Sequence, residues 1–163
     1  MEVNLENNIY LSVLDQLLDI RYTKSIREEK GGTYGVSCGG SLSTLPSEPD
    51  FMLMIGFDTK PEMADELRDM LLPEIERLAA EGPTEEEMGK IKEYMVKQRA
   101  DNLKQNGSWK QWITNYHLMG VDYTTDYDAI IGSLSAEKVK AIAAKVLESG
   151  NVLKLIMDPA VAE

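Results

Sequence analysis

The sequence has little of the two residue types that most often build metal centres, cysteine and histidine. Cys38 is the only cysteine among the 163 residues, and His117 is the only histidine. One cysteine excludes a disulfide within the chain and leaves the redox compartment open. One imidazole without a neighbouring cysteine falls short of the ligand set of a zinc site. We therefore expect this chain to hold no metal or other cofactor, and we expect His117 to make a single structural hydrogen bond.

The sequence also lacks an excess of basic residues and any long apolar run. Its 28 acidic residues outnumber its 17 basic ones, for a net charge of −11, whereas nucleic acids and anionic membranes bind to basic surfaces. No run reaches the roughly 18 apolar residues that a membrane span takes, and residues 1–6 lack the basic and apolar regions of a secretory signal. We expect no nucleic-acid partner and no membrane span. The compartment of the parent protein, periplasm or cytoplasm, is left open.

The length and the apolar content predict a single domain over residues 1–163. A chain of this length with 43% hydrophobic residues is long enough for one real core and too short for two. Apolar residues at helical spacing predict a long helix from about Leu5 to Glu29. Alternating residues predict strands over about Thr33–Ser43 and Asp50–Asp58, joined by a loop at 45–49. Because this connection is short, the two strands are expected to be antiparallel.

The second predicted strand is apolar on both faces. Such a strand is typically central in its sheet or covered on both sides. Methionines on one of its faces suit a binding wall as well as a core. The two faces consist of Phe51, Leu53, Ile55 and Phe57, and of Met52, Met54 and Gly56.

Helical patterns dominate the rest of the chain. They predict a helix from Pro61 to about Ala80 and a second helix opened by a capping box of Thr84 and Glu87. Strands in one antiparallel sheet with helices on one face make a two-layer α+β fold. The remaining predicted elements are a helix through Trp109, Trp112, Ile113 and Tyr116, a short helix through Tyr127, Ile130 and Ile131, a helix after Ser135, and a last strand over Asn151–Met157 that joins the sheet.

The stretch Ser25–Val36 connects the long helix to the first strand and brings a guanidinium near a phenol. Gly31 and Gly32 indicate a helix end and a tight turn, because glycine adopts positive φ without strain. Arg27 then lies in the last helical turn, and Tyr34 lies near the first residue of the strand. A guanidinium offers a planar fork of donors and a phenol offers one donor on a stiff arm. Together they could hold a peptide carbonyl.

A purely structural alternative exists for the same two side chains. Arg27 can pair with a neighbouring helix carboxylate, Glu28 or Glu29, and Tyr34 can be ordinary sheet packing. If Tyr34 continues the alternation of Val36, it points into the core unless the glycine turn redirects it.

The first predicted strand has one face of small residues. Such a face lets an extended peptide or another backbone come close, or it marks only a twisted strand weakened by glycine. The face comprises Thr33, Gly35, Ser37 and Gly39, opposite Tyr34, Val36 and Cys38.

These features, in this order along the chain, resemble a known family. The long helix ends in Ile26–Tyr34 (IREEKGGTY), two strands and a helix follow, and a second helix opens with Thr84–Glu87 (TEEE). From Leu11 to about Lys104 the chain is similar to the C-terminal homologous domain of pitrilysin/insulinase-type zinc metallopeptidases, the mitochondrial-processing-peptidase-like family. The resemblance implies the ferredoxin-like, two-layer half of that metallohydrolase fold.

The resemblance also implies a division of labour. In these peptidases an N-terminal half carries an inverted zinc motif, His-x-x-Glu-His with a distant Glu, and the C-terminal half closes over the peptide substrate and contributes an Arg and a Tyr. Arg27 and Tyr34 fall on those positions, so the resemblance implies that both bind substrate and that Tyr34 is also catalytic. Zinc is then held by a separate catalytic half, and this chain alone hydrolyses nothing. The alternative is a non-catalytic structural or recognition module, comparable to the inactive subunits of the same fold.

By the same resemblance, this chain is a fragment of a larger peptidase. In the family the long helix is preceded by a strand of the same sheet, and almost nothing precedes the helix here. A missing strand leaves a sheet edge unpaired or a groove open for a partner chain. We expect dependence on the missing portion, or a homodimer formed through the exposed edge.

Overall fold

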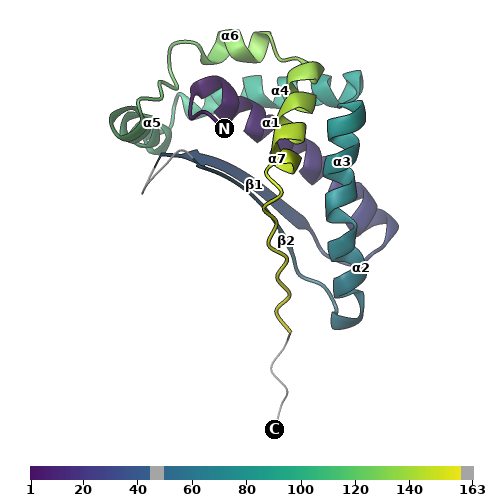
Figure 1. Ribbon diagram of the computed structural model, residues 1–163. Helices are drawn as coiled ribbons and strands as arrows, with labels where there is room; N and C mark the ends of the chain where they lie inside the picture. The colour runs from purple at the N-terminus through teal and green to yellow at the C-terminus, as the bar shows by residue number, and fades with distance from the viewer. Residues whose placement is uncertain (45–49, 159–163) are drawn as a thin grey trace.

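The computed structural model describes residues 1–44 and 50–158, in which helices cover one face of a two-stranded sheet (Figure 1). The predicted loop at 45–49 lies outside the described residues. Two helical elements are not α-helices, since η1 is a π-helix and η2 is a 3₁₀-helix. The elements are α1 (Leu5–Tyr22), η1 (Thr23–Glu29), β1 (Val36–Ser43), β2 (Asp50–Phe57), η2 (Pro61–Met63), α2 (Ala64–Asp69), α3 (Leu71–Glu81), α4 (Glu85–Asn102), α5 (Asn106–Met119), α6 (Tyr127–Gly132) and α7 (Ala136–Glu148).

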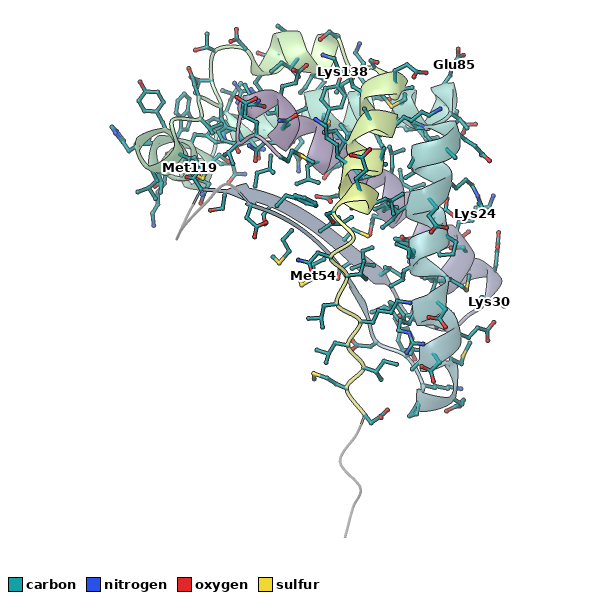
Figure 2. All side chains as sticks on the ribbon, viewed as in Figure 1. Lys24, Lys30, Met54, Glu85, Met119 and Lys138 are labelled. Carbon is teal, nitrogen blue, oxygen red and sulfur yellow. The ribbon has the colours of Figure 1, made fainter. Side chains whose placement is uncertain are left out.

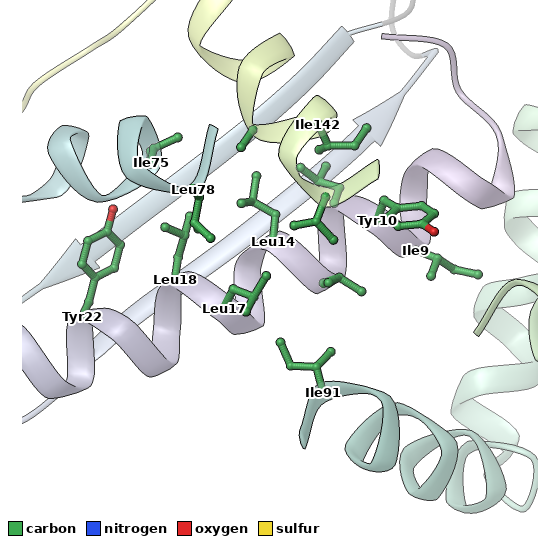
Figure 3. Close-up of a cluster of buried hydrophobic side chains, with 14 of the residues drawn as sticks. Ile9, Tyr10, Leu14, Leu17, Leu18, Tyr22, Ile75, Leu78, Ile91 and Ile142 are labelled. Carbon is green, nitrogen blue, oxygen red and sulfur yellow. The ribbon is translucent and has the colours of Figure 1, made fainter. Parts of the chain in front are cut away.

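Helix α1 lies at the centre of the fold and is buried along most of its length. Its start is capped by Asn4, whose side-chain oxygen accepts a hydrogen bond from the backbone N–H of Asn7 at 2.8 Å. Its apolar residues contact β1 on one side and α3, α4, α6 and α7 on the others. Figure 3 shows part of this core, in which Ile9, Tyr10, Leu14, Leu17, Leu18 and Tyr22 of α1 lie among Ile75 and Leu78 of α3, Ile91 of α4 and Ile142 of α7.

Two buried tyrosines of α1 attach neighbouring helices by hydrogen bonds. The Tyr22 hydroxyl donates to the carbonyl of Leu71 at 2.6 Å, at the start of α3. The Tyr10 hydroxyl accepts from the backbone N–H of Ser135 at 3.1 Å, just before α7. Because a buried hydroxyl without a partner is destabilising, these bonds fix where α3 and α7 meet α1.

The sheet confirms the predicted antiparallel pair and corrects the predicted covering of its second strand. The register runs from Val36 opposite Phe57 to Ser43 opposite Asp50. One face of β2 packs on the core, but Met52 and Met54 on the other face are 57% and 62% exposed. The prediction that both faces of β2 are covered is wrong for the described chain, because the helices lie on one side of the sheet only (Figure 1).

Strand β1 lies close against α1 at Gly40. Its backbone N–H donates to the Asp15 carboxylate of α1 at 2.7 Å. A Cβ at this position would lie 2.5 Å from Cγ of Leu11, so only glycine allows this contact between backbone and helix. Burial raises the pKa of Asp15 to about 6, and one of its carboxylate oxygens has no hydrogen-bond partner within the described residues.

The predicted last strand, Asn151–Met157, does not form. After Gly150, with φ of +60°, the chain runs on as an extended segment that has no strand partner within residues 1–44 and 50–158 (Figure 1). Leu153, Leu155 and Met157 are 88%, 74% and 86% exposed. The apolar alternation is that of a strand, but a strand also needs the N–H and C=O groups of a neighbour.

The helix predicted from Pro61 to about Ala80 is broken into pieces. Pro73 has no N–H to donate to the carbonyl of Asp69, so the helix is interrupted at Met70 between α2 and α3. By contrast, the capping box of Thr84 and Glu87 opens α4 as predicted. None of the helices in the described ranges has both the length and the apolar character that crossing a bilayer takes.

A partly buried ion-pair network joins α1, α3 and α4. Arg21 of α1 donates from Nη1 to Glu74 of α3 at 2.8 Å, and from Nε and Nη2 to Glu87 of α4 at 2.8 and 2.9 Å. Glu87 also closes the capping box by accepting from the backbone N–H of Thr84 at 2.8 Å. The Arg21 hydrogen bond lowers the pKa of Glu87 to about 2. One guanidinium therefore links the central helix to two others.

Removing that guanidinium should destabilise the fold. Arg21→Met leaves the partly buried Glu87 without a cation and leaves Glu74 with only the exposed Arg77, so we expect the free energy of unfolding to fall by about 3–4 kcal/mol. Arg77→Met is the matched control, because Arg77 bonds the same Glu74 at 3.2 Å from a 58% exposed position. That variant should change stability by less than about 0.5 kcal/mol. Urea unfolding at pH 7 measures both, and equal losses would contradict the assigned role of Arg21.

The buried carboxylate of Asp15 predicts a specific pH dependence. Its folded-state pKa of about 6 lies above its ordinary 3.8. Protonation is therefore favoured in the folded state, and the stabilisation is complete below about pH 4 and is lost as the pH rises through 6. Between pH 4 and pH 7, the Asp15 carboxyl should cost the parent chain about 2–3 kcal/mol in free energy of unfolding. Asp15→Asn should not show this loss. Denaturant unfolding at a series of pH values from 4 to 7 measures this difference, and an equal loss of stability in Asp15→Asn and in the parent chain would contradict it.

Candidate functional site

The candidate site is built where the long helix ends. Its last part, η1, is wound as a π-helix, and Ser25 within it donates its hydroxyl to the carbonyl of Arg21 at 3.0 Å. Gly31 then adopts φ of +61°, and its N–H donates to the carbonyl of Arg27 at 3.2 Å. A residue with a Cβ adopts this left-handed conformation only with strain, so Gly31 ends the helix as predicted.

The turn after the helix is fixed on both sides by β2 and α2. A Cβ on the buried Gly32 would lie 2.5 Å from Cδ1 of Leu67 in α2. The carbonyl of Gly32 accepts a hydrogen bond from the hydroxyl of Thr59, just after β2, at 2.5 Å. Lys30 pairs with Glu66 of α2 at 2.5 Å. The backbone between Arg27 and Tyr34 is therefore held in place by the body of the domain.

Arg27 is exposed in the last turn of η1, as expected for a helix end. Within the described ranges its side chain makes no ion pair and no hydrogen bond, although Glu28 and Glu29 are its neighbours. The structural alternative, in which Arg27 is paired with one of those carboxylates, is not observed. The guanidinium is available to a ligand.

Tyr34 is 95% exposed, the highest value among the large apolar and aromatic side chains of the described chain. Strand β1 begins two residues later, at Val36. Thr33 and Gly35 form a tight bend around Tyr34: the Thr33 hydroxyl donates to the carbonyl of Gly35 at 2.9 Å and accepts from its N–H at 3.3 Å. The sequence left open whether Tyr34 continues the alternation of Val36 and Cys38 or is redirected by a turn; in the structure this bend places the phenol outside the strand alternation and in solvent.

A shallow groove starts directly after Tyr34 and follows the end of the sheet. The residues that line it are glycine or serine, except for the apolar Val36 and Phe57 and the carboxylate of Asp58. On the open face of the sheet, cross-strand neighbours pair a small residue with a glycine or a methionine and carry no charge. These pairs are Ser37 with Gly56, Gly39 with Met54, and Ser41 with Met52, while the groove is lined by Gly35, Val36, Ser37, Gly56, Phe57 and Asp58.

The molecule has its glycine turn and its aromatic helix at opposite ends. In Figure 2, Lys24 and Lys30, which flank Arg27 in the sequence, lie at one end of the sheet, and Met119 of α5 lies at the other. Met54 lies between them on the uncovered face. The candidate site therefore occupies one end of the domain, next to the open face of the sheet.

Within the described residues, neither His117 nor Cys38 forms part of a reactive centre. His117 is exposed on α5, where its ring stacks edge-on against Tyr116 with centroids 5.5 Å apart, and it makes none of the predicted structural hydrogen bonds within the described residues. Burial raises the pKa of the Cys38 thiol to about 12, so it stays protonated at neutral pH. Nowhere in residues 1–44 and 50–158 do three or more His, Cys, Asp or Glu side chains gather as a metal site would need.

Sequence analysis missed the role of Arg99. It is buried in α4, with its guanidinium stacked between the rings of Trp112 and Tyr127 at 4.7 and 4.6 Å from their centroids. It also donates to the carbonyl of Thr124 at 3.3 Å. A signal was present, because Arg99 follows Ile91 and Met95 at helical spacing on the core stripe of α4. Arg99 holds α5 and α6 on α4 and lies outside the candidate site.

Comparison with known proteins decides the family. The family profile described as "Peptidase M16 inactive domain" matches residues 2–95, more than half of the chain. The chain belongs to this family. The predicted resemblance to the C-terminal homologous domain of pitrilysin/insulinase-type metallopeptidases is thereby confirmed.

Individual relatives agree with this family and differ in length. The chain is 27% identical over 103 residues to a zinc protease PQQL-like protein of Arabidopsis thaliana, covering 61% of this chain and 11% of that protein. Its fold matches the periplasmic protease PqqL of Escherichia coli with a TM-score of 0.74, at 18% identity, over 89% of this chain and 16% of the other. It also matches the ferredoxin protease FusC, solved as a mutant in complex with Arabidopsis ferredoxin, with a TM-score of 0.65 at 15% identity, over 86% of this chain and 16% of the other.

The chain is thus an inactive domain of the M16 peptidase family, which includes zinc proteases, and the structural matches confirm the predicted α+β fold. The chain spans only about a tenth to a sixth of the length of these relatives. Metallopeptidase, protease and hydrolase describe the family to which the domain belongs. The catalytic half of such a protease is separate from this domain.

Proposed function

We propose that this chain is the zinc-free, substrate-binding C-terminal domain of a zinc metalloendopeptidase that acts on peptides. In this proposal it closes over the active site of a separate catalytic half, which holds the zinc ion. Membership of the inactive-domain family supports the assignment, as does the zinc protease name of the Arabidopsis relative. No cluster able to hold a metal occurs in the described part of the chain.

The observation that carries the proposal is the exposure of Tyr34 on a rigidly held turn. Its phenol is 95% exposed and has no hydrogen-bond partner within the described residues, and Arg27 is exposed on the same helix end. Buried contacts at Gly32 hold the backbone between them. Two free donors on a fixed backbone are suited to a ligand that has several acceptors, as a peptide backbone does.

Each of the two side chains has a distinct proposed role. Tyr34 donates a hydrogen bond to the scissile carbonyl oxygen as negative charge develops there, which stabilises the transition state more than the ground state. Arg27 binds a backbone carbonyl or a carboxylate of the substrate through its guanidinium fork. When bound in the other half, zinc polarises the carbonyl and activates water; the residues of this chain orient the peptide.

The groove beside Tyr34 supports a polypeptide substrate. Four of its six lining residues are glycine, serine or valine, so an extended backbone can approach it closely along that part, with Phe57 and Asp58 beside it. The FusC relative was solved with a protein, ferredoxin, in its complex, which is consistent with peptide or protein substrates in this fold. We propose that an extended segment of substrate lies along this groove with Tyr34 at its end.

The alternative function is a non-catalytic structural or recognition module of the same fold. In that case Arg27 and Tyr34 only pack against another domain. A His-x-x-Glu-His sequence in the same polypeptide or in a partner subunit favours the peptidase domain, and its absence from both favours the structural module.

Substitution of the two side chains in the assembled protease tests the proposal. Tyr34→Phe removes only the hydroxyl, and we expect kcat to fall by about 10²–10³, as for loss of one oxyanion donor. Arg27→Ala should mainly raise KM for a peptide substrate, because it removes a ground-state contact. Tyr94→Phe is the matched control: Tyr94 is 51% exposed on α4, and its loss should leave both constants unchanged. Unchanged kinetics in Tyr34→Phe and Arg27→Ala would remove the proposed site.

A further inference from the structure

Helix α5 packs on the described residues along one side only. None of its residues is buried, and the half-buried ones recur at spacings of four and three residues, so they form one stripe along the helix. Trp112 of this stripe stacks on the buried guanidinium of Arg99 in α4. The other sides of α5 face solvent. The half-buried residues are Ser108, Trp112, Asn115 and Met119.

A second apolar stripe lies beside the first and is exposed. Trp109, Ile113 and Tyr116 also recur at spacings of four and three residues, so they share one face of the helix. They are 40%, 55% and 56% exposed. We call this stripe the α5 face. Tryptophan and tyrosine are enriched in binding surfaces, because each offers a large apolar ring with one polar group.

The α5 face is held in place by contacts inside the described part of the chain. An isolated helix of this length is marginal in water, but α5 is fixed at both ends. The Trp109 indole N–H donates to the carbonyl of Leu103 at 2.9 Å, and its ring meets that of Trp112 edge-on with centroids 5.2 Å apart. Gly120 ends the helix with φ of +71°, and its N–H donates to the carbonyl of Tyr116 at 3.0 Å. Because the face is preformed, little conformational entropy is lost when a ligand binds to it.

The charge around the α5 face is opposite in sign to that of the whole chain. Residues 102–121 contain no acidic residue, although the chain has 28 of them and a net charge of −11. Lys110 and His117, seven residues apart, border the α5 face on one side. Among the described residues, Lys110 has no ion-pair partner. An acidic ligand is therefore attracted here and repelled by most of the remaining surface.

We propose that the α5 face binds an acidic, apolar segment of the protein substrate, away from the bond that is cleaved. This inference rests on the proposed function, since it takes the ligand to be a polypeptide that Tyr34 contacts elsewhere along its length. The α5 face then selects substrates by the charge of that distal segment.

The open face of the sheet connects the two places. Figure 1 shows α5 beside the end of the sheet at which β1 ends and β2 begins, and Tyr34 precedes the start of β1. From Tyr34 to Ser43 is about nine residues, which an extended chain spans in about 30 Å. The open face between them carries no charge until its last pair, Ser43 with Asp50. The acidic residues of the substrate are therefore expected beyond Asp50, next to Lys110.

A second copy of this chain and a further domain fit the α5 face less well. Two α5 faces in a symmetric dimer would bring Lys110 of each copy to the same contact, and an α5 face on another surface of a second copy would give an open chain of molecules. Permanent contacts are larger and more apolar than a stripe of three side chains bordered by a lysine. A ligand that binds and leaves fits this surface.

Tryptophan fluorescence tests the site directly, because both tryptophans of the sequence, Trp109 and Trp112, lie on α5. The probe is a tryptophan-free peptide of about eight residues in which Asp and Leu alternate, and the matched peptide has Lys in place of Asp. We expect the acidic peptide to reduce acrylamide quenching of the chain and to bind at least about 10-fold more tightly than the basic one. Its affinity should fall as NaCl is raised, because salt screens exposed charges.

Two substitutions on α5 have matched controls on α4. Lys110→Glu reverses the charge beside the α5 face and Tyr116→Ser removes one of its rings, and each should weaken binding of the acidic peptide by about 10-fold. Lys97→Glu makes the same change in net charge at an exposed position of α4. Tyr94→Ser removes a ring that is 51% exposed on α4. Both controls should leave the affinity unchanged.

Cleavage by the assembled protease separates this site from the proposed function. An acidic segment placed about nine residues from the cleaved bond should lower KM by about 10-fold relative to a basic segment there, and Lys110→Glu should remove that difference. A peptide too short to reach α5 should be cleaved equally by Lys110→Glu and by the parent enzyme, whereas Tyr34→Phe should lower kcat for both peptides. Absence of the charge preference with an intact Tyr34 effect overturns only the α5 site, and the reverse overturns only the role of Tyr34.

Four other results would overturn the proposal. Equal affinities for the two peptides, or equal weakening by Lys97→Glu, would show that the α5 face does not select acidic segments. Tighter binding to phosphatidylglycerol vesicles than to the acidic peptide would make it a membrane contact. A dimeric sedimentation coefficient that becomes monomeric in Tyr116→Ser would make a second copy the partner. Protection of Tyr116 from nitration in the assembled protease without peptide would make the α5 face a contact between domains.

Discussion

Burial of α1 along most of its length is the constraint on which the rest of the structure depends. This one helix packs against β1 and also contacts α3, α4, α6 and α7. Its polar groups are used as anchors: Tyr22 for α3, Tyr10 for α7, and Arg21 for both α3 and α4. Since the helix cannot shift without breaking these bonds, its C-terminal end is a fixed point. The candidate site is placed at that point.

At the end of this helix, buried core side chains are followed within a few residues by exposed polar ones. Ile26 is fully buried, whereas Arg27 next to it is exposed. Gly31 reverses the chain with positive φ, and Gly32 lies so close to Leu67 that a Cβ there would require the Leu67 methyl group to shift. The Tyr34 side chain then projects into solvent, two residues before β1 begins at Val36. A long helix, two glycines and a bend thus deliver two donors to one end of the domain.

Local signals in the sequence predicted most of the fold. The spacing of apolar residues found α1 with η1, the capping box found α4, and alternation found β1 and β2 in the correct pairing. The errors came from interactions that are not local. Segment 151–157 has the pattern of a strand, but pairing depends on a neighbour that the pattern does not contain, and the covering of Met52 and Met54 depends on which side the helices take. Tyr34 was assigned to the strand because alternation does not reveal the bend made by Thr33. Arg27 and Tyr34 as a functional pair came from the resemblance to the peptidase family, since their spacing alone left a structural alternative open.

The central claim is that Tyr34 faces the substrate when the zinc half is present. Replacing Tyr34 by the photoreactive residue p-benzoylphenylalanine in the assembled protease and irradiating it with a bound, uncleaved peptide measures this contact directly. The account predicts a covalent adduct between this chain and the peptide, competed away by excess unlabelled peptide, and no adduct from the same replacement at Tyr94, which is exposed on α4. Adducts only to other parts of the protease, or equal peptide adducts from both positions, would contradict it.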